Sequence, residues 1–376
     1  MNRCRICQGE LSKELLVLKN VPAAAQNMPA TREECLADKG IDLALCQCLN
    51  CGVLQHTAPP VPYYREVIRA SGVSEAMKQF RLEQFGSWVK RYGLTGKKVF
   101  EAGCGRGEYL SLMNDSGVTA CGTESGANAV EICRAMGLEV FRTFFENGDE
   151  KLPQAPYDGF FVLNFLEHIP DIPAFLTGIR GNLCNGAPGI IEVPNLDMIL
   201  ANAQLTEYSC EHIYYFTAAN LTAMLQNHGF DVISCRSVWH DYIISAEVIK
   251  RKAVDLSSCH AVRQELTAQI HHFAAQCGKC AFWGAGHQAL TTLALTGMDR
   301  KKICFVADSS PEKQNRFTFT THIPIVAPEA LADDDIDGVI VACGGYSDEV
   351  AGLITQRFSQ IRHLAILREN KLEIIK

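Results

Sequence analysis

Short apolar segments alternate with segments of helical periodicity in the middle of the chain, from about residue 97 to about residue 250. The apolar segments have the length of buried strands, and helical patterns fill most of the intervals between them. The strands predicted in this way are 98–101, 118–123, 138–141, 158–163, 188–193, 231–236 and 243–249. This order is typical of an α/β fold with a doubly wound sheet that ends in an antiparallel hairpin.

The segments that flank this region are also patterned. Residues 63–92 predict a helix, because their large apolar side chains recur at helical spacing, and residues 255–278 predict a helical connector. Beyond the connector, residues 280–286 and 338–345 each read as a strand that runs into a glycine turn, with a further strand at 302–308. This second, smaller set of elements predicts a Rossmann-type unit.

Length and charge narrow the class of protein. A chain of 376 residues is too long for one ordinary domain, so two or three domains are expected. The net charge of −7 argues against a nucleic-acid partner, which usually needs a basic face. The longest apolar runs are shorter than a membrane span, and the first residues lack a hydrophobic signal region. A cytoplasmic protein without a membrane partner is therefore expected, and the sequence indicates no particular oligomeric state.

Four of the 17 cysteines have the spacing of metal ligands. Cys4 and Cys7 form one CxxC pair, and Cys48 and Cys51 form a second. Two such pairs can supply four thiolates to one tetrahedral Zn²⁺, which leaves no open position and predicts a structural zinc ion. The alternative is four reduced thiols that bind no metal. A further pair, 277–280, has no partner pair and predicts a surface and strand-start position.

Three glycines follow the strand at 98–101 at every second position, as Gly103, Gly105 and Gly107. They permit a tight turn and a close approach of the backbone to a ligand. A helix begins just after them, and the next strand ends at Glu124, whose carboxylate is placed to accept the two hydroxyls of a ribose. The pattern predicts a nucleotide-binding α/β sheet, with a merely structural turn as the alternative.

Together these features resemble the class I S-adenosylmethionine (SAM) methyltransferases. Glu101 matches the acidic residue of their motif, the glycines match its turn, and Glu124 matches the ribose ligand. Residues 157–164 resemble the fourth strand of that family, and residues 165–171 resemble its post-strand loop. The resemblance implies that SAM is the cofactor and that its binding residues are Glu101, Gly103, Cys104, Gly105, Gly107, Glu124, Ser125 and Asn164.

The order of a cysteine knuckle, a SAM domain and a small Rossmann-like domain resembles, over nearly the whole chain, the sugar C-methyltransferases that act on nucleotide-linked keto-deoxysugars. Residues 211–217 match the EHxxYF signature of that family, residues 308–314 and 321–325 match its C-terminal motifs, and the four paired cysteines match its zinc ligands. The domains that it implies are a zinc-binding module at 1–60, a methyltransferase domain at 61–252 and a Rossmann-like substrate-binding domain at 253–376. It also implies that the nucleotide sugar lies between the last two.

Three departures from that family bear on the reaction. Ser209 stands where the family has a catalytic tyrosine, and residues 67–72 align with a second one. Asn315 replaces a glycine, and residues 319–320 replace a Pro-Gly pair. Methyl transfer to an oxygen or nitrogen of a sugar or related small molecule is therefore the alternative to carbon methylation. A zinc-containing binding protein is an alternative of another class.

Carbon methylation beside a ketone requires a base that removes a proton and a group that stabilises the enolate oxygen. His212 is the leading base, because the neighbouring Glu211 is expected to orient its imidazole and to raise its pKa. His168, just after the fourth strand, is expected to act as a second base or to hold the enolate. The alternatives are a buried hydrogen-bonding histidine for His212 and a helix cap for His168.

Five residues are expected to contact the substrate. Gly284, Gly286 and His287 belong to the glycine turn of the C-terminal unit and are expected to touch a phosphate. Lys313 offers its charge to a diphosphate, and Tyr215 is expected in the wall of the pocket. The alternatives are an exposed histidine, a surface lysine and a core tyrosine. The single GxG of this turn is weak support for a bound dinucleotide.

Overall fold

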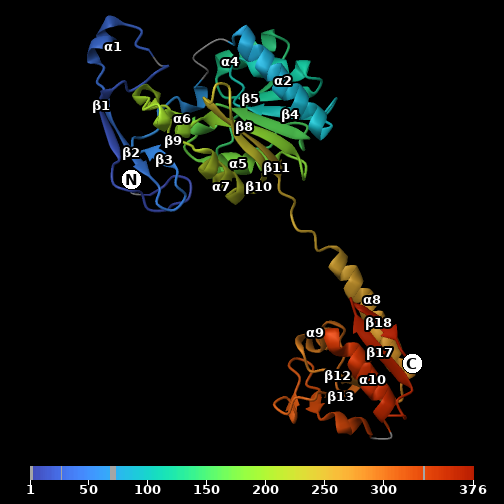
Figure 1. Ribbon diagram of the computed structural model, residues 1–376. Helices are drawn as coiled ribbons and strands as arrows, with labels where there is room; N and C mark the ends of the chain where they lie inside the picture. The colour runs from blue at the N-terminus through green and yellow to red at the C-terminus, as the bar shows by residue number, and fades with distance from the viewer. Residues whose placement is uncertain (1–2, 27, 68–72, 333–334) are drawn as a thin grey trace. The chain divides into compact units, whose positions relative to one another are not determined.

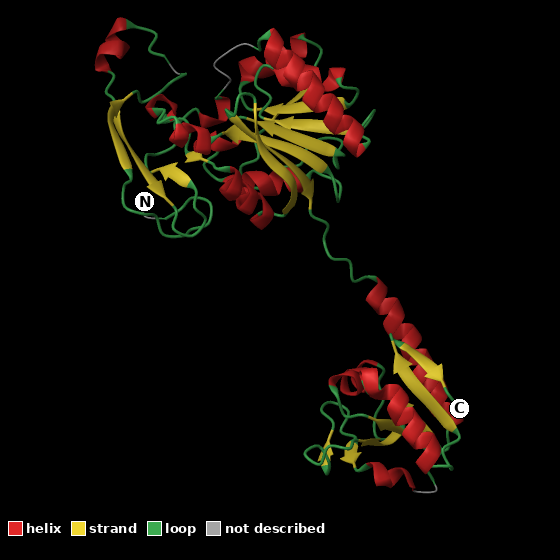
Figure 2. Ribbon diagram, viewed as in Figure 1, coloured by secondary structure: helices red, strands yellow, loops and turns green. Residues whose placement is uncertain are grey.

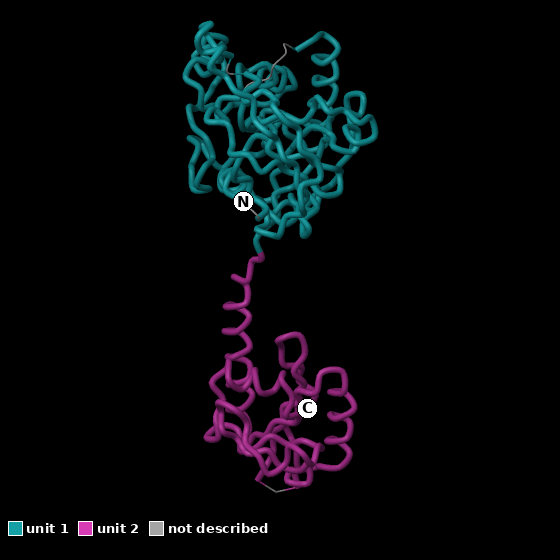
Figure 3. Tube along the Cα trace, turned by 90° about the vertical axis from the view of Figure 1, so that its left-hand side faces the viewer, with its two compact units in different colours: residues 1–253 teal, residues 254–376 magenta. Residues whose placement is uncertain are grey.

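The computed structural model describes residues 3–26, 28–67, 73–332 and 335–376. The chain divides into two compact units, residues 1–253 and residues 254–376 (Figure 3). The predicted segments 1–60 and 61–252 both fall within the first unit, so their separation into two domains stays a prediction.

A seven-stranded sheet forms the centre of the first unit (Figures 1 and 2). Its strands follow in the order β10-β11-β8-β7-β4-β5-β6, and only β11 runs antiparallel to its neighbours. Their bounds are β4 Lys98–Ala102, β5 Thr119–Glu124, β6 Glu139–Arg142, β7 Gly159–Leu163, β8 Pro188–Pro194, β10 Phe230–Val238 and β11 Ile243–Lys250. Each predicted strand matches one of these to within two residues at either end, which confirms the doubly wound α/β sheet.

Helices cover both faces of this sheet, with α2 and α4 on one face and α5 and α7 on the other (Figure 1). The helices of this unit are α1 Arg32–Ala37, α2 Glu75–Tyr92, α3 Glu108–Asp115, α4 Ala127–Ala135, α5 Ile172–Gly181, α6 Leu196–Ala201 and α7 Ala218–Asn227. Along β7, Phe160 and Val162 pack in the cluster that includes α5 and α7, whereas Phe161 and Leu163 pack in the cluster that includes α2 to α4. Burial on both faces explains why this strand is apolar at every position.

The prediction of one helix over residues 63–92 is wrong at its start, because α2 begins only at Glu75. The Ser74 hydroxyl accepts a hydrogen bond from the Met77 amide and so caps the first turn. Residues Tyr64–Glu66 form a separate 3₁₀ turn, η1. Apolar periodicity does not reveal such a start, since it depends on the cap and on what the preceding residues pack against.

The N-terminal segment forms a small sheet of its own, in the order β1-β2-β3-β9. Its strands are β1 Leu16–Val21, β2 Ile41–Gln47, β3 Leu54–His56 and β9 Tyr214–Tyr215. The pairing of β3 with β9 is antiparallel, and the His56 amide also donates a hydrogen bond to the Ile213 carbonyl at 3.2 Å. The N-terminal segment is thereby fastened to the loop that carries Glu211 and His212.

The second unit has a seven-stranded sheet in the order β14-β15-β13-β12-β16-β17-β18. Its strands are β12 Cys280–Trp283, β13 Ile303–Ala307, β14 Arg316–Phe317, β15 Pro324–Val326, β16 Gly338–Val341, β17 His363–Arg368 and β18 Lys371–Ile374, and its helices are α8 Ser258–Gln276, α9 His287–Leu295 and α10 Ser347–Arg357. The five inner strands are parallel, and each edge strand is antiparallel, which confirms the predicted Rossmann-type unit. Across the described residues, no helix has the length and apolar character needed to cross a membrane.

Candidate active site

Hydrogen bonds join the glycine turn after β4 to the end of β5. Gly103, Gly105 and Gly107 have φ angles of 77°, 56° and 84°, in the left-handed region that favours glycine. The Gly103 amide donates to the Thr123 carbonyl at 3.0 Å, and the Gly105 amide donates to Glu124 Oε2 at 3.0 Å. The backbone of the turn therefore lies directly beside the carboxylate at the tip of the neighbouring strand.

Glu124 is buried, and its other carboxylate oxygen accepts a hydrogen bond from the Gly126 amide at 2.8 Å. Burial raises the pKa of this carboxyl group, and the amide donors partly oppose the rise. Each carboxylate oxygen has a second lone pair, which is what a ribose hydroxyl needs. Ser125 is less available, because its hydroxyl donates to the Arg65 carbonyl.

The other predicted cofactor residues lie in different surroundings. Glu101 is completely buried at the end of β4. Cys104 is buried with its sulfur under β5, since a Cβ at Gly122 would lie 2.5 Å from that sulfur. Only the Cys104 backbone is thus positioned toward a ligand. Asn164, with a φ of 51°, lines the same small cavity as Gly103.

Two small cavities lie at this turn. One, of about 20 Å³, is lined by Gly103, Gly105 and Asn164 among others. The second, of about 10 Å³, is lined by Glu124 and Ser125 among others. Pockets for small ligands usually measure about 300–1,000 Å³, so the turn is closed to a molecule the size of SAM in this conformation.

Phe165 is one of the residues that close the turn. A Cβ at Gly103 would lie only 2.3 Å from Phe165 Cδ1, so the ring lies directly against the glycine. Phe165 follows β7 and lines both cavities. A cofactor that enters the turn must therefore displace this ring.

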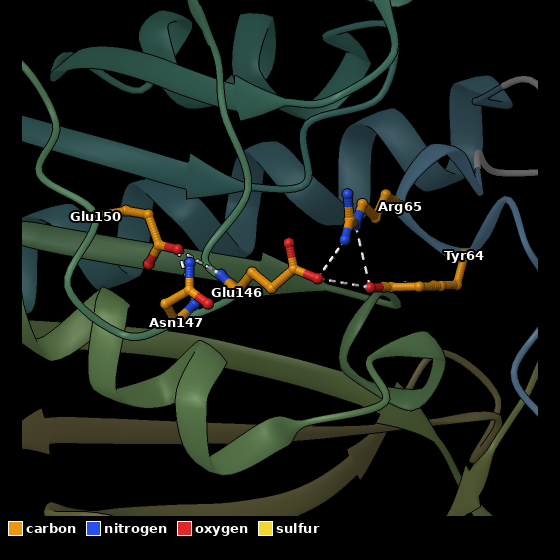
Figure 4. Close-up of polar contacts among 5 residues, drawn as sticks. All are labelled: Tyr64, Arg65, Glu146, Asn147 and Glu150. Carbon is orange, nitrogen blue, oxygen red and sulfur yellow. Dashed lines mark hydrogen bonds and ion pairs between the residues drawn. The ribbon is translucent and has the colours of Figure 1, made fainter.

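The η1 segment also lies over this region. Figure 4 shows the Arg65 guanidinium and the Tyr64 hydroxyl converging on the carboxylate of Glu146, and the Tyr64–Glu146 distance is 3.3 Å. Glu150 braces the Glu146 loop by accepting the amides of Glu146 and Asn147 at 2.9 and 2.8 Å. The Arg65 and Glu146 side chains are about half exposed, so their ion pair stabilises the position of η1 over the turn only weakly.

His168 and His212 lie together at the carboxyl end of β7. Their ring centroids are 4.8 Å apart, and the rings are nearly perpendicular. His168 Nδ1 lies 2.9 Å from the Glu211 carbonyl oxygen, which can only accept, so Nδ1 carries the hydrogen and Nε2 keeps its lone pair. Burial lowers the pKa of His168 to about 4, and burial together with His168 lowers the pKa of His212 to about 3. Both imidazoles are neutral near pH 7.

The expected role of Glu211 needs correction. Its Oε1 atom accepts hydrogen bonds from the amides of Ala25 and Gln26, at 3.0 and 2.9 Å, and from the Tyr63 hydroxyl at 2.7 Å. Within the described residues, no hydrogen bond joins this carboxylate to the His212 imidazole. Glu211 therefore anchors the N-terminal segment, and its tendency to raise the pKa of His212 is outweighed by burial.

Glu167 is a member of this cluster that the sequence reasoning missed. It is buried, burial raises its pKa to about 8, and its Oε1 atom lies 3.8 Å from His168 Nε2. The Glu167 carbonyl accepts the Ile213 amide at 2.8 Å, which ties the loop after β7 to the loop before β9. A signal was present, because Glu167–His168 repeats the Glu-His dipeptide found at 211–212.

The tyrosines near the histidines, Tyr208 and Tyr215, make contacts within their own loop. The Tyr215 hydroxyl accepts the Ser209 amide at 3.0 Å and donates to the Ser209 carbonyl at 3.2 Å. Tyr215 is buried, and Tyr208 packs edge-on against it with ring centroids 5.1 Å apart. This packing gives no support to a substrate contact for Tyr215. The expected position of the second family tyrosine, residues 67–72, lies outside the described residues except for Val67.

The four paired cysteines lie close enough to share one metal ion. The sulfurs of Cys4 and Cys51 are 3.7 Å apart, and those of Cys7 and Cys48 are 3.5 Å apart. Ligands at a Zn–S distance of about 2.3 Å in a tetrahedron are about 3.8 Å apart, so the spacing fits zinc. The amides of Ile6 and Cys51 point at the sulfurs of Cys4 and Cys48, each at 3.4 Å, as donors to thiolates should.

In the second unit, four of the predicted substrate residues line one pocket of about 670 Å³: Gly284, Gly286, His287 and Lys313. Asp308, at the end of β13, accepts the Ala285 amide at 2.7 Å and the Lys313 ammonium at 3.1 Å. The pocket also lies at the N-terminus of α9, where backbone amides favour an anion.

The family model described as a methyltransferase domain matches residues 73–235, and the one described as a C-methyltransferase C-terminal domain matches residues 256–361. The C-methyltransferase NovU of Streptomyces niveus is 24% identical over 390 residues, which cover 93% of this chain and 91% of that protein. A ubiquinone biosynthesis O-methyltransferase of Vibrio atlanticus is 34% identical over 94 residues, or 23% of this chain and 39% of that protein.

The magnesium protoporphyrin IX methyltransferase of Synechocystis, with bound SAH, aligns with a TM-score of 0.38 and 16% identity, over 49% of this chain and 90% of that one.

Proposed function

We propose that this chain, which is a SAM-dependent methyltransferase, transfers the methyl group of SAM to a carbon atom of a nucleotide-linked keto-deoxysugar. Similarity to a C-methyltransferase over 93% of the chain supports the carbon acceptor. The match of residues 256–361 to a C-methyltransferase C-terminal domain supports the same acceptor from the second unit.

The observation that carries this proposal is the pair of neutral imidazoles, His168 and His212, with ring centroids 4.8 Å apart at the carboxyl end of β7. A neutral imidazole with a free lone pair can take the proton from the carbon beside a ketone. The resulting carbanion attacks the methyl carbon, the methyl–sulfur bond breaks, and the sulfonium becomes a neutral thioether. The acceptor thus loses a proton and gains a methyl group.

Binding of the cofactor is assigned to the turn at Gly103–Gly107 and to Glu124, whose second lone pairs would accept the ribose hydroxyls. The donor is a sulfonium cation, so a buried carboxylate beside the turn also favours it electrostatically. The Phe165 ring, which the cofactor must displace from Gly103, would then pack beside the bound cofactor and help to exclude water from the transfer step.

The nucleotide part of the substrate is assigned to the pocket of the second unit. Its volume of about 670 Å³ is in the range of small-ligand sites. The start of α9 and the Lys313 ammonium both favour a phosphate there. A structural zinc ion is assigned to Cys4, Cys7, Cys48 and Cys51, where four thiolates leave no open position for a substrate.

Methylation of a sugar oxygen or nitrogen is the second candidate. It is favoured by Ser209, which stands where the resembled family has a catalytic tyrosine. A hydroxyl or amine acceptor needs a base but no stabilisation of an enolate, so this tyrosine would matter less for it.

Proton exchange tests the carbon acceptor. The protein would be incubated in heavy water with S-adenosylhomocysteine and a nucleotide-linked 4-keto-6-deoxysugar, and the protons beside the ketone would be followed by NMR. We expect exchange above the protein-free rate, loss of it in His168→Ala or His212→Ala, and retention in His260→Ala, which changes an exposed histidine of α8. A protein that binds both ligands without exchange would contradict carbon methylation of that sugar.

A further inference from the structure

We propose that His56 is a positioning residue for the proposed reaction, because it holds the loop that carries His212 in place from the N-terminal sheet. Residues 210–213, the histidine loop, include both Glu211 and His212. His56 is the last residue of β3 and is completely buried. The catalytic role of the loop rests on the proposed function, whereas the contacts of His56 do not depend on which atom is methylated.

His56 contacts both ends of the histidine loop. Its backbone amide donates to the Ile213 carbonyl at 3.2 Å, and its Nε2 atom lies 3.1 Å from the Cys210 carbonyl oxygen. A carbonyl oxygen can only accept, so Nε2 carries the ring hydrogen and donates it. The two bonds flank Glu211 and His212, so a single residue of the N-terminal segment fixes the loop on either side of them.

The surroundings of the His56 ring keep it neutral near pH 7. Burial, together with the charge of Arg5, lowers its pKa to about 4. Its Nδ1 atom has no hydrogen-bond partner among the described residues. A buried polar atom without a partner is costly, and an apolar side chain would avoid that cost. The bond from Nε2 to the Cys210 carbonyl is therefore the contact that the imidazole supplies here and an apolar residue could not.

The Cys210 carbonyl depends on this donor. Within the part of the chain that the structure describes, no other hydrogen bond reaches this oxygen. Cys210 is itself buried. Removal of the imidazole N–H would leave a buried carbonyl without a partner, and the loop would move to satisfy it.

The strand that carries His56 is held on both sides. β3 lies between β2 and β9 in the small sheet, so both of its edges are paired (Figure 1). Val53, just before β3, packs in the same apolar cluster as Ile213 and Leu166, which lie in the loops of His212 and His168. The N-terminal segment therefore sets the position of the histidine loop together with the central sheet.

Both imidazoles of the proposed reaction depend on the position of this loop. His212 is part of it, and the Glu211 carbonyl accepts the hydrogen bond from His168 Nδ1 at 2.9 Å. A displaced loop would move the His212 ring and weaken the bond that keeps the lone pair of His168 on Nε2. A misplacement of a reacting group by about 1 Å can cost about 100-fold in rate.

Two substitutions separate the hydrogen bond from simple packing. His56→Leu removes the donor, whereas His56→Gln keeps one, because the glutamine amide nitrogen is as many bonds from Cβ as Nε2 is. In the heavy-water assay we expect exchange to fall by about 10- to 100-fold in His56→Leu and to stay near the wild-type rate in His56→Gln. His260→Leu, the same change at an exposed histidine of α8, is the matched control. Equal losses in the Leu and Gln variants would overturn the role of the hydrogen bond.

Calorimetric titration with SAM shows whether the variants are folded. The described contacts of His56 do not reach the glycine turn, so SAM affinity should be unchanged in His56→Leu and His56→Gln. If His56→Leu does not fold, the wild-type protein decides. Nitrogen-15 NMR of histidine-labelled protein at pH 7 should show the hydrogen of His56 on Nε2, and a hydrogen on Nδ1 instead would overturn the proposal.

The same spectra separate this inference from the proposed function, because they need no substrate. The ring signals of His168 and His212 should shift in His56→Leu and keep their wild-type positions in His56→Gln. Such shifts, in a protein whose wild type shows no proton exchange, would contradict the carbon acceptor and leave the role of His56 standing. Exchange at the wild-type rate in folded His56→Leu would overturn the role of His56 and leave the carbon acceptor standing.

Discussion

The two units contain the same structural motif, in which a strand runs into a glycine turn beside an acidic residue at the end of the next strand. The charges around this motif differ between the units. In the first unit, Glu124 accepts hydrogen bonds from the backbone amides of Gly105 and Gly126. In the second, Asp308 accepts an amide and also the ammonium of Lys313 at 3.1 Å. The first turn thus offers negative charge, which suits a sulfonium and a ribose, whereas the second adds positive charge, which suits a phosphate.

The two glycine turns also differ in how accessible they are to a ligand. The cavity at the first turn measures about 20 Å³ and Phe165 lies against its glycine, whereas the pocket at the second turn measures about 670 Å³. The same local sequence pattern therefore fixes the backbone of a site, while residues far away in the sequence decide whether the site is open and which charge it prefers.

The largest effect is expected from a methyl group on the first turn. Gly103→Ala puts a residue with a side chain at a φ of 77°, and its Cβ would point into the space that the Phe165 ring now fills and that the cofactor must enter. Together these cost about 3 kcal/mol or more, so SAM binding should be undetectable by calorimetric titration. Gly286→Ala is the matched control, since its Cβ would meet nothing within 4 Å, and it should bind SAM normally. Equal losses in both variants would contradict the account.

Removal of the negative charge at the first turn comes next. Glu124→Gln replaces two charged acceptor oxygens, and hydrogen bonds to charged groups contribute about 1.5–3 kcal/mol each. We expect SAM affinity to fall by about 10- to 100-fold in the same titration. Asp308→Asn, the corresponding change at the second turn, should leave SAM affinity unaltered. A similar loss in both would mean that the two acidic residues do not serve different ligands.

Acid should unfold the first unit before the second. Burial lowers the pKa of His56 to about 4, below its usual 6.5, so the unfolded state binds more protons and stability falls as the pH drops through 6.5 toward 4. From pH 7 to pH 5 this amounts to about 2 kcal/mol. Despite burial, which opposes it, hydrogen bonds from Ser310 and Ala285 and the charge of Lys313 lower the pKa of Asp308. Its stabilisation is lost only below the ordinary aspartate pKa.

Hydrogen exchange measured by mass spectrometry at pH 7 and pH 5 would check this order. Peptides around β3 should lose protection at pH 5 while those around β13 keep it. In His56→Gln the loss between these pH values should shrink by about 2 kcal/mol. An unchanged loss in this variant would show that His56 does not set the acid sensitivity.

The smallest effect is expected at the second turn. The Lys313 side chain is 44% exposed, so its charge is partly screened. Lys313→Ala should weaken binding of a nucleoside diphosphate by roughly 3- to 10-fold and reduce the salt dependence of that binding. Lys301→Ala, another exposed lysine of this unit, should change neither. If Lys301→Ala has the larger effect, the pocket is not the phosphate site.

The strands of the central sheet, three inner strands of the second unit (β12, β13 and β16) and both glycine turns could be predicted from the sequence, because each depends on neighbouring residues. A parallel strand buried on both faces, such as β7, is apolar at every position, and a turn with positive φ requires glycine. The spacing of the paired cysteines likewise indicated four sulfurs at one place.

The features that the sequence did not predict depend on contacts between distant residues. The start of α2 depends on the Ser74 cap, and the pairing of β3 with β9 joins segments about 160 residues apart. Glu211 was expected to serve His212 because it is adjacent in sequence, but Tyr63 and the amides of the N-terminal segment engage its carboxylate. Glu167 was missed because its burial arises only when the loops after β7 and before β9 meet.

Identification of the methylated atom tests the central claim most directly. The protein would be given SAM with a carbon-13 label in its methyl group, together with a nucleotide-linked 4-keto-6-deoxysugar, and the product would be analysed by NMR. The account predicts a labelled methyl group with the chemical shift and coupling of a methyl on carbon. A labelled methyl on oxygen or nitrogen would contradict it.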